Sequence, residues 1–298
     1  MDSYAQAVLG KFEEWLRLER GLAAASVRTY VLHAGVFVDW LVVQAGASLP
    51  VLDARLVVRF VQRNAERGYS FNYLITRHNA VRCFLRFLHS QGLVGQSLAG
   101  AVPPVAGWKL SSIPRGLEAA QIEALLCCFD VSTATGLRDR AMVLLMARLG
   151  LRRIEVARLR LDDVNWRSGT LTISGKAMHV EQLPLLSAVG QGLSDYLLKS
   201  RPQCACREMF VTVRRPYRPI NSDVVGAVMS RASGRAGIGQ VGAHRLRHTL
   251  AINLLESGSG LAQIGQVLRH ESALATAIYA KVDYRRLAEL ARPWPESR

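Results

Sequence analysis

Residues 244–249 read His-Arg-Leu-Arg-His-Thr, and no other part of the chain says more about its architecture. The apolar pattern predicts a helix from Ala243 onward. His244 and Arg247 are three residues apart, so they share one face of that helix. An imidazole beside a guanidinium is a good site for a phosphate group. On its own, such a pair is more often a basic face turned to solvent, so the interpretation needs support from elsewhere in the chain.

Three further segments carry cationic or nucleophilic side chains. One is Gly150-Leu151-Arg152-Arg153-Ile154-Glu155, and another is Ser174-Gly175-Lys176 on a predicted β-hairpin. The last is Leu268-Arg269-His270, which is followed nine residues later by Tyr279. Taken singly, a lysine in a turn is typical of solvent exposure, and a tyrosine on an apolar helix is typical of a core. Only the four segments together are informative.

In this order and spacing, the four segments resemble the tyrosine recombinase, or phage integrase, family over nearly the whole chain. The likeness is greatest to short Xer-like and transposon-borne site-specific recombinases. The positions that match the family's catalytic set are Arg152, Lys176, His244, Arg247, His270 and the nucleophile Tyr279. Glu155 and His248 match supporting positions.

The resemblance implies that Tyr279 attacks a DNA phosphodiester, forms a 3′-phosphotyrosine and releases a 5′-hydroxyl. A covalent intermediate conserves the energy of the broken bond, so no nucleotide cofactor is expected. Arg152 and Arg247 would stabilise the charge of the transition state, and His270 would donate to the same oxygens. Because these fixed cations can replace a divalent metal, no metal is expected. His244 would accept the proton of the phenol or orient it.

The leaving oxygen must also gain a proton, and the resemblance makes Lys176 the expected general acid, placed by the flexible hairpin. Glu155 is expected to orient His244 or an arginine rather than to react. A carboxylate exposed on a helix surface is the alternative interpretation of Glu155.

Two departures from the family pattern are visible. The family usually has glycine where this chain has Arg269, a change that would alter the turn or add a phosphate contact. After Lys176 the family tends to carry further basic residues, whereas residues 177–181 read Ala-Met-His-Val-Glu. Contacts between the hairpin and DNA would then be weaker, or would be made by His179.

The composition agrees with a nucleic-acid partner. Lys and Arg total 38 against 23 Asp and Glu, a formal net charge of +15. Such an excess indicates a polyanionic partner, here double-stranded DNA, although a basic and well-solvated surface is the alternative. Hydrophobic residues make up 50% of the chain, which excludes global disorder.

The expected location is the cytoplasm, in association with the nucleoid and without a membrane partner. The N-terminus lacks the pattern of a secretory signal. The apolar stretch Val36–Val43 is interrupted by Asp39 and is too short to span a bilayer. The five cysteines match neither a disulfide framework nor a zinc site.

The expected fold class is mainly α, with a small antiparallel β-sheet in the C-terminal domain, arranged as a two-domain DNA clamp. Residues 1–100 would form a helical core-binding, SAM-like domain. Residues 101–116, rich in Pro and Gly, would form a linker. Residues 117–298 would form the tyrosine recombinase catalytic domain with a C-terminal docking tail.

Several elements can be placed from the pattern of residues. Helices are expected over Phe71–Leu88, Leu117–Phe129 and Leu137–Leu149, and strands over Thr170–Ser174 and Val180–Leu186. Ser26 is expected to cap the helix that carries Val27. On the outer face of the Phe71–Leu88 helix, Arg77, Arg82 and Arg86 would contact either solvent or DNA phosphates.

The resemblance also implies a homotetramer, or a heterotetramer with a related recombinase, on two synapsed duplexes. Leu287 and Leu290 of the tail would dock on a neighbouring protomer. Two alternatives remain at this point: a catalytically silent DNA-binding relative, and a strand transferase of the type IB topoisomerase kind. These residues do not decide among DNA integration, excision and resolution, although Arg269 and the altered hairpin favour a mobile-element relative over a housekeeping one. The target sequence is not readable from them.

Overall fold

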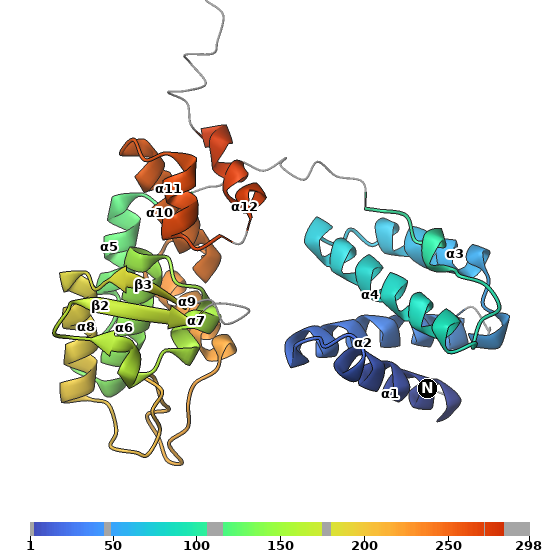
Figure 1. The fold of residues 1–298 in the computed structure, drawn as a ribbon, viewed down its shortest axis with the longest axis horizontal. Helices are drawn as coiled ribbons and strands as arrows, with labels where there is room; N and C mark the ends of the chain where they lie inside the picture. The colour runs from blue at the N-terminus through green and yellow to red at the C-terminus, as the bar shows by residue number, and fades with distance from the viewer. Residues whose placement is uncertain (1–2, 45–48, 106–115, 175–179, 271, 283–298) are drawn as a thin grey trace, which may run out of the picture. The chain divides into compact units, whose positions relative to one another are not determined.

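The computed structural model describes residues 3–44, 49–105, 116–174, 180–270 and 272–282, and it divides the chain into two compact units, Met1–Ser111 and Ser112–Arg298 (Figure 1). The boundary between the units falls within the predicted linker, most of which lies outside the described residues. Each unit has its own hydrophobic core.

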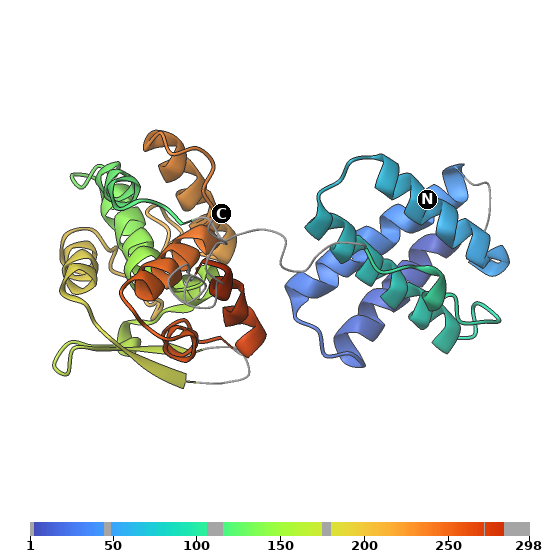
Figure 2. The same ribbon diagram turned by 90° about the horizontal axis from the view of Figure 1, so that it is seen from above.

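The N-terminal unit is a helical bundle, as Figures 1 and 2 show. Its α-helices are α1 (Ser3–Leu18), α2 (Ala24–Asp39), α3 (Ala54–Glu66) and α4 (Phe71–Ser90). Short helical turns are η1 (Trp40–Gln44), η2 (Leu49–Val51) and η3 (Ala99–Ala101). The core is aromatic: the Phe12 and Phe84 ring centroids lie 5.0 Å apart, edge to face, and Phe37 and Phe60 repeat that arrangement.

Two expectations about α2 are corrected. The N-cap of α2 is Ala23, so Ser26 lies inside the helix instead of capping it. The π-helical turn η1 continues α2, so Ala24–Val43 is long and apolar enough by composition to cross a membrane, contrary to the shorter estimate. The buried side chains of this segment, among them Phe37 and Leu41, pack in the core of the bundle. That packing accounts for its apolar character.

The three arginines of α4 do not share one environment, so the predicted basic face is wrong in part. Arg77 is 3% exposed, and its guanidinium contacts Asn64 Oδ1 at 2.5 Å, Tyr73 and His33. Arg82 is half-buried and donates to the carbonyl oxygen of Val102 at 3.0 Å. Only Arg86 is fully on the surface. Helical spacing places all three toward one side, but partners from α2 and α3 draw Arg77 inward.

In the C-terminal unit, a small sheet lies along one side of a group of helices (Figures 1 and 2). Its strands, in the order β1-β2-β3, are β1 (Val164–Asn165), β2 (Thr170–Ser174) and β3 (Val180–Pro184), and both pairings are antiparallel. Leu171 and Ile173 of β2 are buried against the helices, whereas β3 is mostly exposed. β2 has the predicted bounds, and β3 ends two residues earlier than predicted because Leu186 already caps the next helix.

The helices of this unit are α5 (Ala119–Cys127), α6 (Ala134–Leu149), α7 (Arg153–Arg158), α8 (Ser187–Lys199), α9 (Ser222–Arg235), α10 (Ala243–Glu256), α11 (Leu261–Val267) and α12 (Ala273–Ala277). The 3-10 turns are η4 (Leu161–Asp163) and η6 (Ile278–Val282). α6 is the central helix, because almost all of its side chains are buried. α10, α11 and η6 enclose a smaller second core that includes Ala251, Ile264 and Leu268.

Replacing Arg77 by Leu should lower the free energy of unfolding by about 1–3 kcal/mol, because Asn64 and the Tyr73 hydroxyl then lose a charged donor inside the bundle. Urea unfolding of the full chain measures the change. Arg86→Ala is the matched control and should unfold like the wild type, since Arg86 is exposed. An Arg77→Leu protein of unchanged stability but weakened DNA binding would instead support the original assignment of Arg77 to phosphate.

Candidate active site

The first arginine of the site is placed by a left-handed glycine. Gly150 ends α6 with φ 61°, and a Cβ at this position would lie 3.0 Å from the side chains of both Leu250 and Leu268. Only glycine fits there without displacing its neighbours. The turn makes Arg152 the N-cap of α7 and directs the Gly150 carbonyl to Arg247.

Glu155 is the anchor for Arg152. One carboxylate oxygen accepts from the backbone N–H of Arg152 at 2.8 Å, and the other accepts from its guanidinium at 2.6 Å. The Glu155 side chain is 3% exposed. Burial alone would raise the pKa of Glu155, but the charge of Arg269 and the hydrogen bonds from Arg152 hold that pKa below its usual value. The surface-carboxylate alternative is therefore wrong, and Glu155 orients arginines as expected.

Arg247, on α10, is 2% exposed and donates to the Gly150 carbonyl at 2.7 Å. Its Nη2 atom is buried and has no hydrogen-bond partner among the described residues. Burial, together with the charges of Arg152 and Arg269, lowers the pKa of Arg247 to about 9. A buried guanidinium with one unused donor favours the arrival of an anion.

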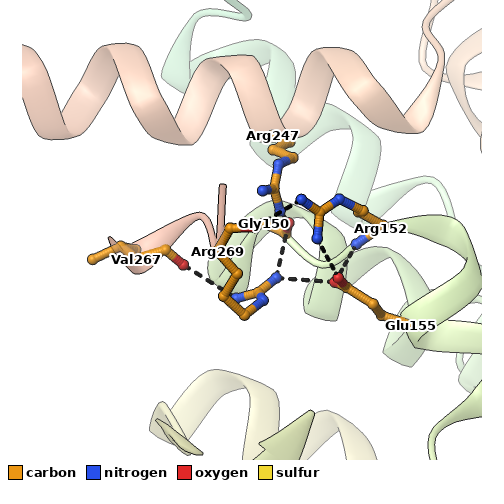
Figure 3. A network of polar contacts seen from close by, with 6 residues as sticks. All are labelled: Gly150, Arg152, Glu155, Arg247, Val267 and Arg269. Atoms are coloured by element: carbon orange, nitrogen blue, oxygen red, sulfur yellow. Dashed lines mark hydrogen bonds and ion pairs between the residues drawn. The ribbon is translucent and has the colours of Figure 1, made fainter. Parts of the chain in front are cut away.

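Arg269 does not project into solvent, as a phosphate-contacting residue would. Its φ of 54° lies in the left-handed region, which costs an ordinary residue about 1–2 kcal/mol. The backbone explains this conformation: Arg269 and His270 donate to the carbonyls of Gln266 and Gly265, a turn that commonly ends a helix on glycine. The Arg269 side chain is 5% exposed and binds Glu155 Oε2 at 3.0 Å (Figure 3).

The predicted nucleophile, Tyr279, lies against a histidine that the resemblance treats only as a supporting residue. The Tyr279 hydroxyl and His248 Nδ1 share a hydrogen bond of 2.8 Å. Tyr279 is 1% exposed, and its ring is stacked on that of His270 with the centroids 6.3 Å apart. Burial raises the pKa of Tyr279 to about 12. The His270 Nδ1 atom is held in turn by the Thr276 hydroxyl at 2.6 Å.

His248, not His244, therefore makes the described contact with the phenol. The two imidazoles lie on one face of α10 with ring centroids 4.4 Å apart, and His244 is exposed. Burial, with the charges of His244 and Arg247 nearby, lowers the pKa of His248 to about 4. Burial, with the charges of Arg247 and Arg152, does the same for His270. The four-residue spacing between His244 and His248 was the signal in the sequence that they share a face.

The structure thus brings together, in one unit, all but one of the predicted catalytic residues and both supporting residues. Arg152, His244 and Arg247 line a cavity of about 440 Å³ that also borders Leu151 and Ser222. Lys176 and His179 lie outside the described residues, as do Leu287 and Leu290. Within the described part of the chain, no group of three or more His, Cys, Asp or Glu side chains is arranged to hold a metal.

Comparison with known proteins relates both units to phage integrases. Residues 115–286 match the model of the phage integrase family, and residues 9–92 match the SAM-like N-terminal domain of phage integrases. An integrase/recombinase of Sinorhizobium fredii, y4rA, is 38% identical over 99% of this chain and 73% of its own length. The tyrosine recombinase XerD of Xanthomonas axonopodis is 29% identical over 95% of both chains.

Solved structures agree on the fold. The XerH site-specific recombinase, in a post-cleavage complex with palindromic difH substrate, matches 97% of this chain and 85% of its own, with a TM-score of 0.75 and 20% identity. A lambda integrase dimer bound to a COC′ core site matches 98% of both chains, with a TM-score of 0.67 and 17% identity. The mainly helical fold class with a small antiparallel sheet is confirmed, and the chain belongs to the phage integrase family of tyrosine recombinases.

Proposed function

We propose that the chain is a site-specific DNA recombinase that cuts and rejoins strands through a 3′-phosphotyrosine at Tyr279. The observation that carries this proposal is the buried Nη2 of Arg247, which has no partner in the described part of the chain and belongs to a residue that lines, with Arg152, a cavity large enough for a phosphate. An unused buried donor is costly in the free protein, and a phosphodiester oxygen would satisfy it.

The two guanidinium groups provide the charge stabilisation that the reaction needs. A phosphodiester gains negative charge on its equatorial oxygens as the phenol attacks, and preorganised cations stabilise that charge without reorganising. Arg152 is held on Glu155 and Arg247 on the Gly150 carbonyl, so both keep fixed positions. No step in this scheme draws on a nucleotide or a metal. Lys176 remains the proposed donor of a proton to the leaving 5′-oxygen.

The proton of the nucleophile would pass to His248. A phenol with a pKa of about 12 is neutral at physiological pH, so it needs an acceptor as it attacks. His248 has a pKa of about 4 and is therefore neutral, and its Nδ1 already lies 2.8 Å from the hydroxyl. His244 would then act on His248 or on the phosphate. Since Tyr279 is 1% exposed, DNA binding must make its hydroxyl accessible.

Double-stranded DNA is the proposed substrate, contacted by both units. Arg86 on α4 is the remaining candidate of the three predicted arginines for an N-terminal phosphate contact, because it alone is exposed. We propose that four copies, or two copies with a related recombinase, assemble on paired duplexes. A cytoplasmic, nucleoid-associated location follows from the same DNA-binding role.

Tyr279→Phe should abolish covalent attachment to DNA while leaving DNA binding intact, because it removes only the attacking oxygen. The assay mixes purified protein and EDTA with nicked duplexes tiled from the DNA that flanks the gene, and denaturing gels detect the adduct. An adduct from the wild type alone supports the proposal and identifies the target site. Binding without any adduct would favour the silent DNA-binding alternative. Adducts at many unrelated sequences would favour the topoisomerase-like alternative.

His248→Ala should slow single-turnover cleavage about 100-fold, within the range expected for loss of a proton acceptor. His248→Asn is the matched variant. The amide oxygen of Asn can still accept a hydrogen bond from the phenol, but it is not basic, so cleavage by this variant should be slowed almost as much as by His248→Ala. Full cleavage by His248→Asn would show that the residue only orients Tyr279.

The cleavage rate of the wild type should not fall between pH 8 and pH 5.5, because histidines with pKa values of about 4 stay neutral there. The pKa values of His248 and His270 are lower in the folded protein than their usual 6.5, so protonation favours the unfolded chain. Their contribution to stability is complete above about pH 6.5 and is lost as the pH falls toward 4. Single-turnover rates and thermal unfolding, measured at the same pH values, separate the two effects. A rate that halves near pH 6.5 in fully folded protein would contradict the assignment.

A further inference from the structure

Arg269 combines two features that are rarely found together: a left-handed backbone and a buried charged side chain. The turn needs a φ of 54° at this position, where glycine is the unstrained choice. A strained residue that persists in a site indicates that its surroundings compensate for the strain. Here the compensation is visible in the bond from the Arg269 guanidinium to Glu155 at 3.0 Å and in weaker contacts to the carbonyls of Val267 and Gly150.

We propose that Arg269 is a positioning residue: by binding Glu155, it keeps the Arg152 guanidinium available for the scissile phosphate and fixes the turn that carries His270. This inference rests on the proposed recombinase function. It assigns to this arginine neither a DNA contact nor a direct role at the reacting atoms.

Arg269 changes the balance of charge around Glu155. Glu155 is nearly inaccessible to solvent, and its two oxygens are divided between two guanidinium groups (Figure 3). Oε1 accepts from Arg152, whereas Oε2 accepts from the Arg152 backbone and from Arg269. Without Arg269, the carboxylate charge would be neutralised by Arg152 alone. The cation that faces the phosphate would then lose much of its net attraction for an anion.

The backbone of Arg269 also holds Arg152 in place. The Arg269 carbonyl accepts from Nη2 of Arg152 at 2.8 Å, so the turn holds the second arm of the same guanidinium. Arg152 is therefore fixed on one arm by Glu155 and on the other by the backbone of residue 269. The next residue, His270, stacks on the nucleophile. Through one residue, two catalytic segments far apart in the sequence share a single rigid support.

A direct contact between Arg269 and a phosphate is the alternative. The Arg269 side chain is 5% exposed, and its guanidinium is directed at Glu155. Arg152, in contrast, has 36% of its side chain exposed and lines the 440 Å³ cavity. Arg152 is thus the more exposed of the two cations. Arg269 borders a different cavity, of about 610 Å³, together with Gln266 and His270, but its guanidinium is held by Glu155.

Three substitutions separate the side chain from the turn. Gly and Asn both tolerate a positive φ and keep the carbonyl that binds Arg152, but neither carries the charge. In single-turnover cleavage at saturating protein, Arg269→Gly and Arg269→Asn should each be at least about 10-fold slower than the wild type, with DNA affinity changed less than about threefold. Arg269→Lys keeps the charge without the planar fork and should recover part of the rate.

Arg231→Ala is the matched control. Arg231 is exposed on α9, so this variant loses the same charge without touching the cluster and should cleave like the wild type. Thermal unfolding of every variant shows whether the compared proteins are folded. A folded Arg269→Gly protein that cleaves at the wild-type rate would overturn the proposal. So would a loss of rate explained wholly by weaker DNA binding.

A double-mutant cycle with Glu155→Gln tests whether Arg269 acts through Glu155. If it does, Glu155→Gln should slow cleavage much less in the Arg269→Gly protein than in the wild type, or should partly restore the cleavage rate of the Arg269→Gly protein. If the fold-changes in cleavage rate caused by the two substitutions simply multiply in the double mutant, the proposal that Arg269 acts through Glu155 is overturned. Absence of an adduct from the wild type would overturn the recombinase function itself. A wild-type adduct with an unimpaired Arg269→Gly protein would overturn only the positioning role.

Discussion

The catalytic unit depends on one buried carboxylate among three guanidinium groups. Glu155 binds Arg152 and Arg269 directly, and both of these arginines depress the pKa of Arg247. Like charges gathered in one site destabilise the free protein. The fold offsets this repulsion with the Glu155 carboxylate and with the Gly150 and Arg269 carbonyls, which accept from Arg247 and Arg152. The remaining excess of positive charge is what a phosphodiester would neutralise. Under the proposed function, the site would hold, before DNA arrives, the electrostatic arrangement that the transition state requires.

Two helix ends in the left-handed conformation build this arrangement, and the residue at each is set by its neighbours. At Gly150 a Cβ would lie 3.0 Å from the side chains of Leu250 and Leu268, so both leucines would have to shift, and glycine avoids this while also adopting the positive φ. At residue 269 the same conformation is available to an arginine, because its side chain turns back toward Glu155. The same left-handed backbone conformation therefore allows close packing at Gly150 and places a charged side chain at Arg269.

Much of this was predictable from the sequence, for identifiable reasons. Helical periodicity located α4 and α6 to within a few residues, and β-branched residues located β2. The order of the four segments indicated the family and the catalytic set. Arg77 was misplaced because periodicity gives a face but not the partner that draws a side chain inward. The contact of His248 with Tyr279 and the bond of Arg269 with Glu155 join segments distant in sequence, and local patterns carry no information about such pairs.

The state of Tyr279 constrains how the reaction is controlled. Under the proposed function, this buried phenol with a raised pKa is a poor nucleophile in the free protein, and its hydrogen bond holds it beside the proposed proton acceptor, His248. The surrounding residues include Ala251 on α10, Ile264 on α11 and Leu268 at the C-cap of α11, and α10 also carries three of the predicted site residues. Exposing the Tyr279 hydroxyl would break its hydrogen bond to His248 and its stacking on His270. Under the proposed function, DNA bound at the arginines would have to release Tyr279 from these contacts, which would restrict cleavage to protein that already holds a phosphate.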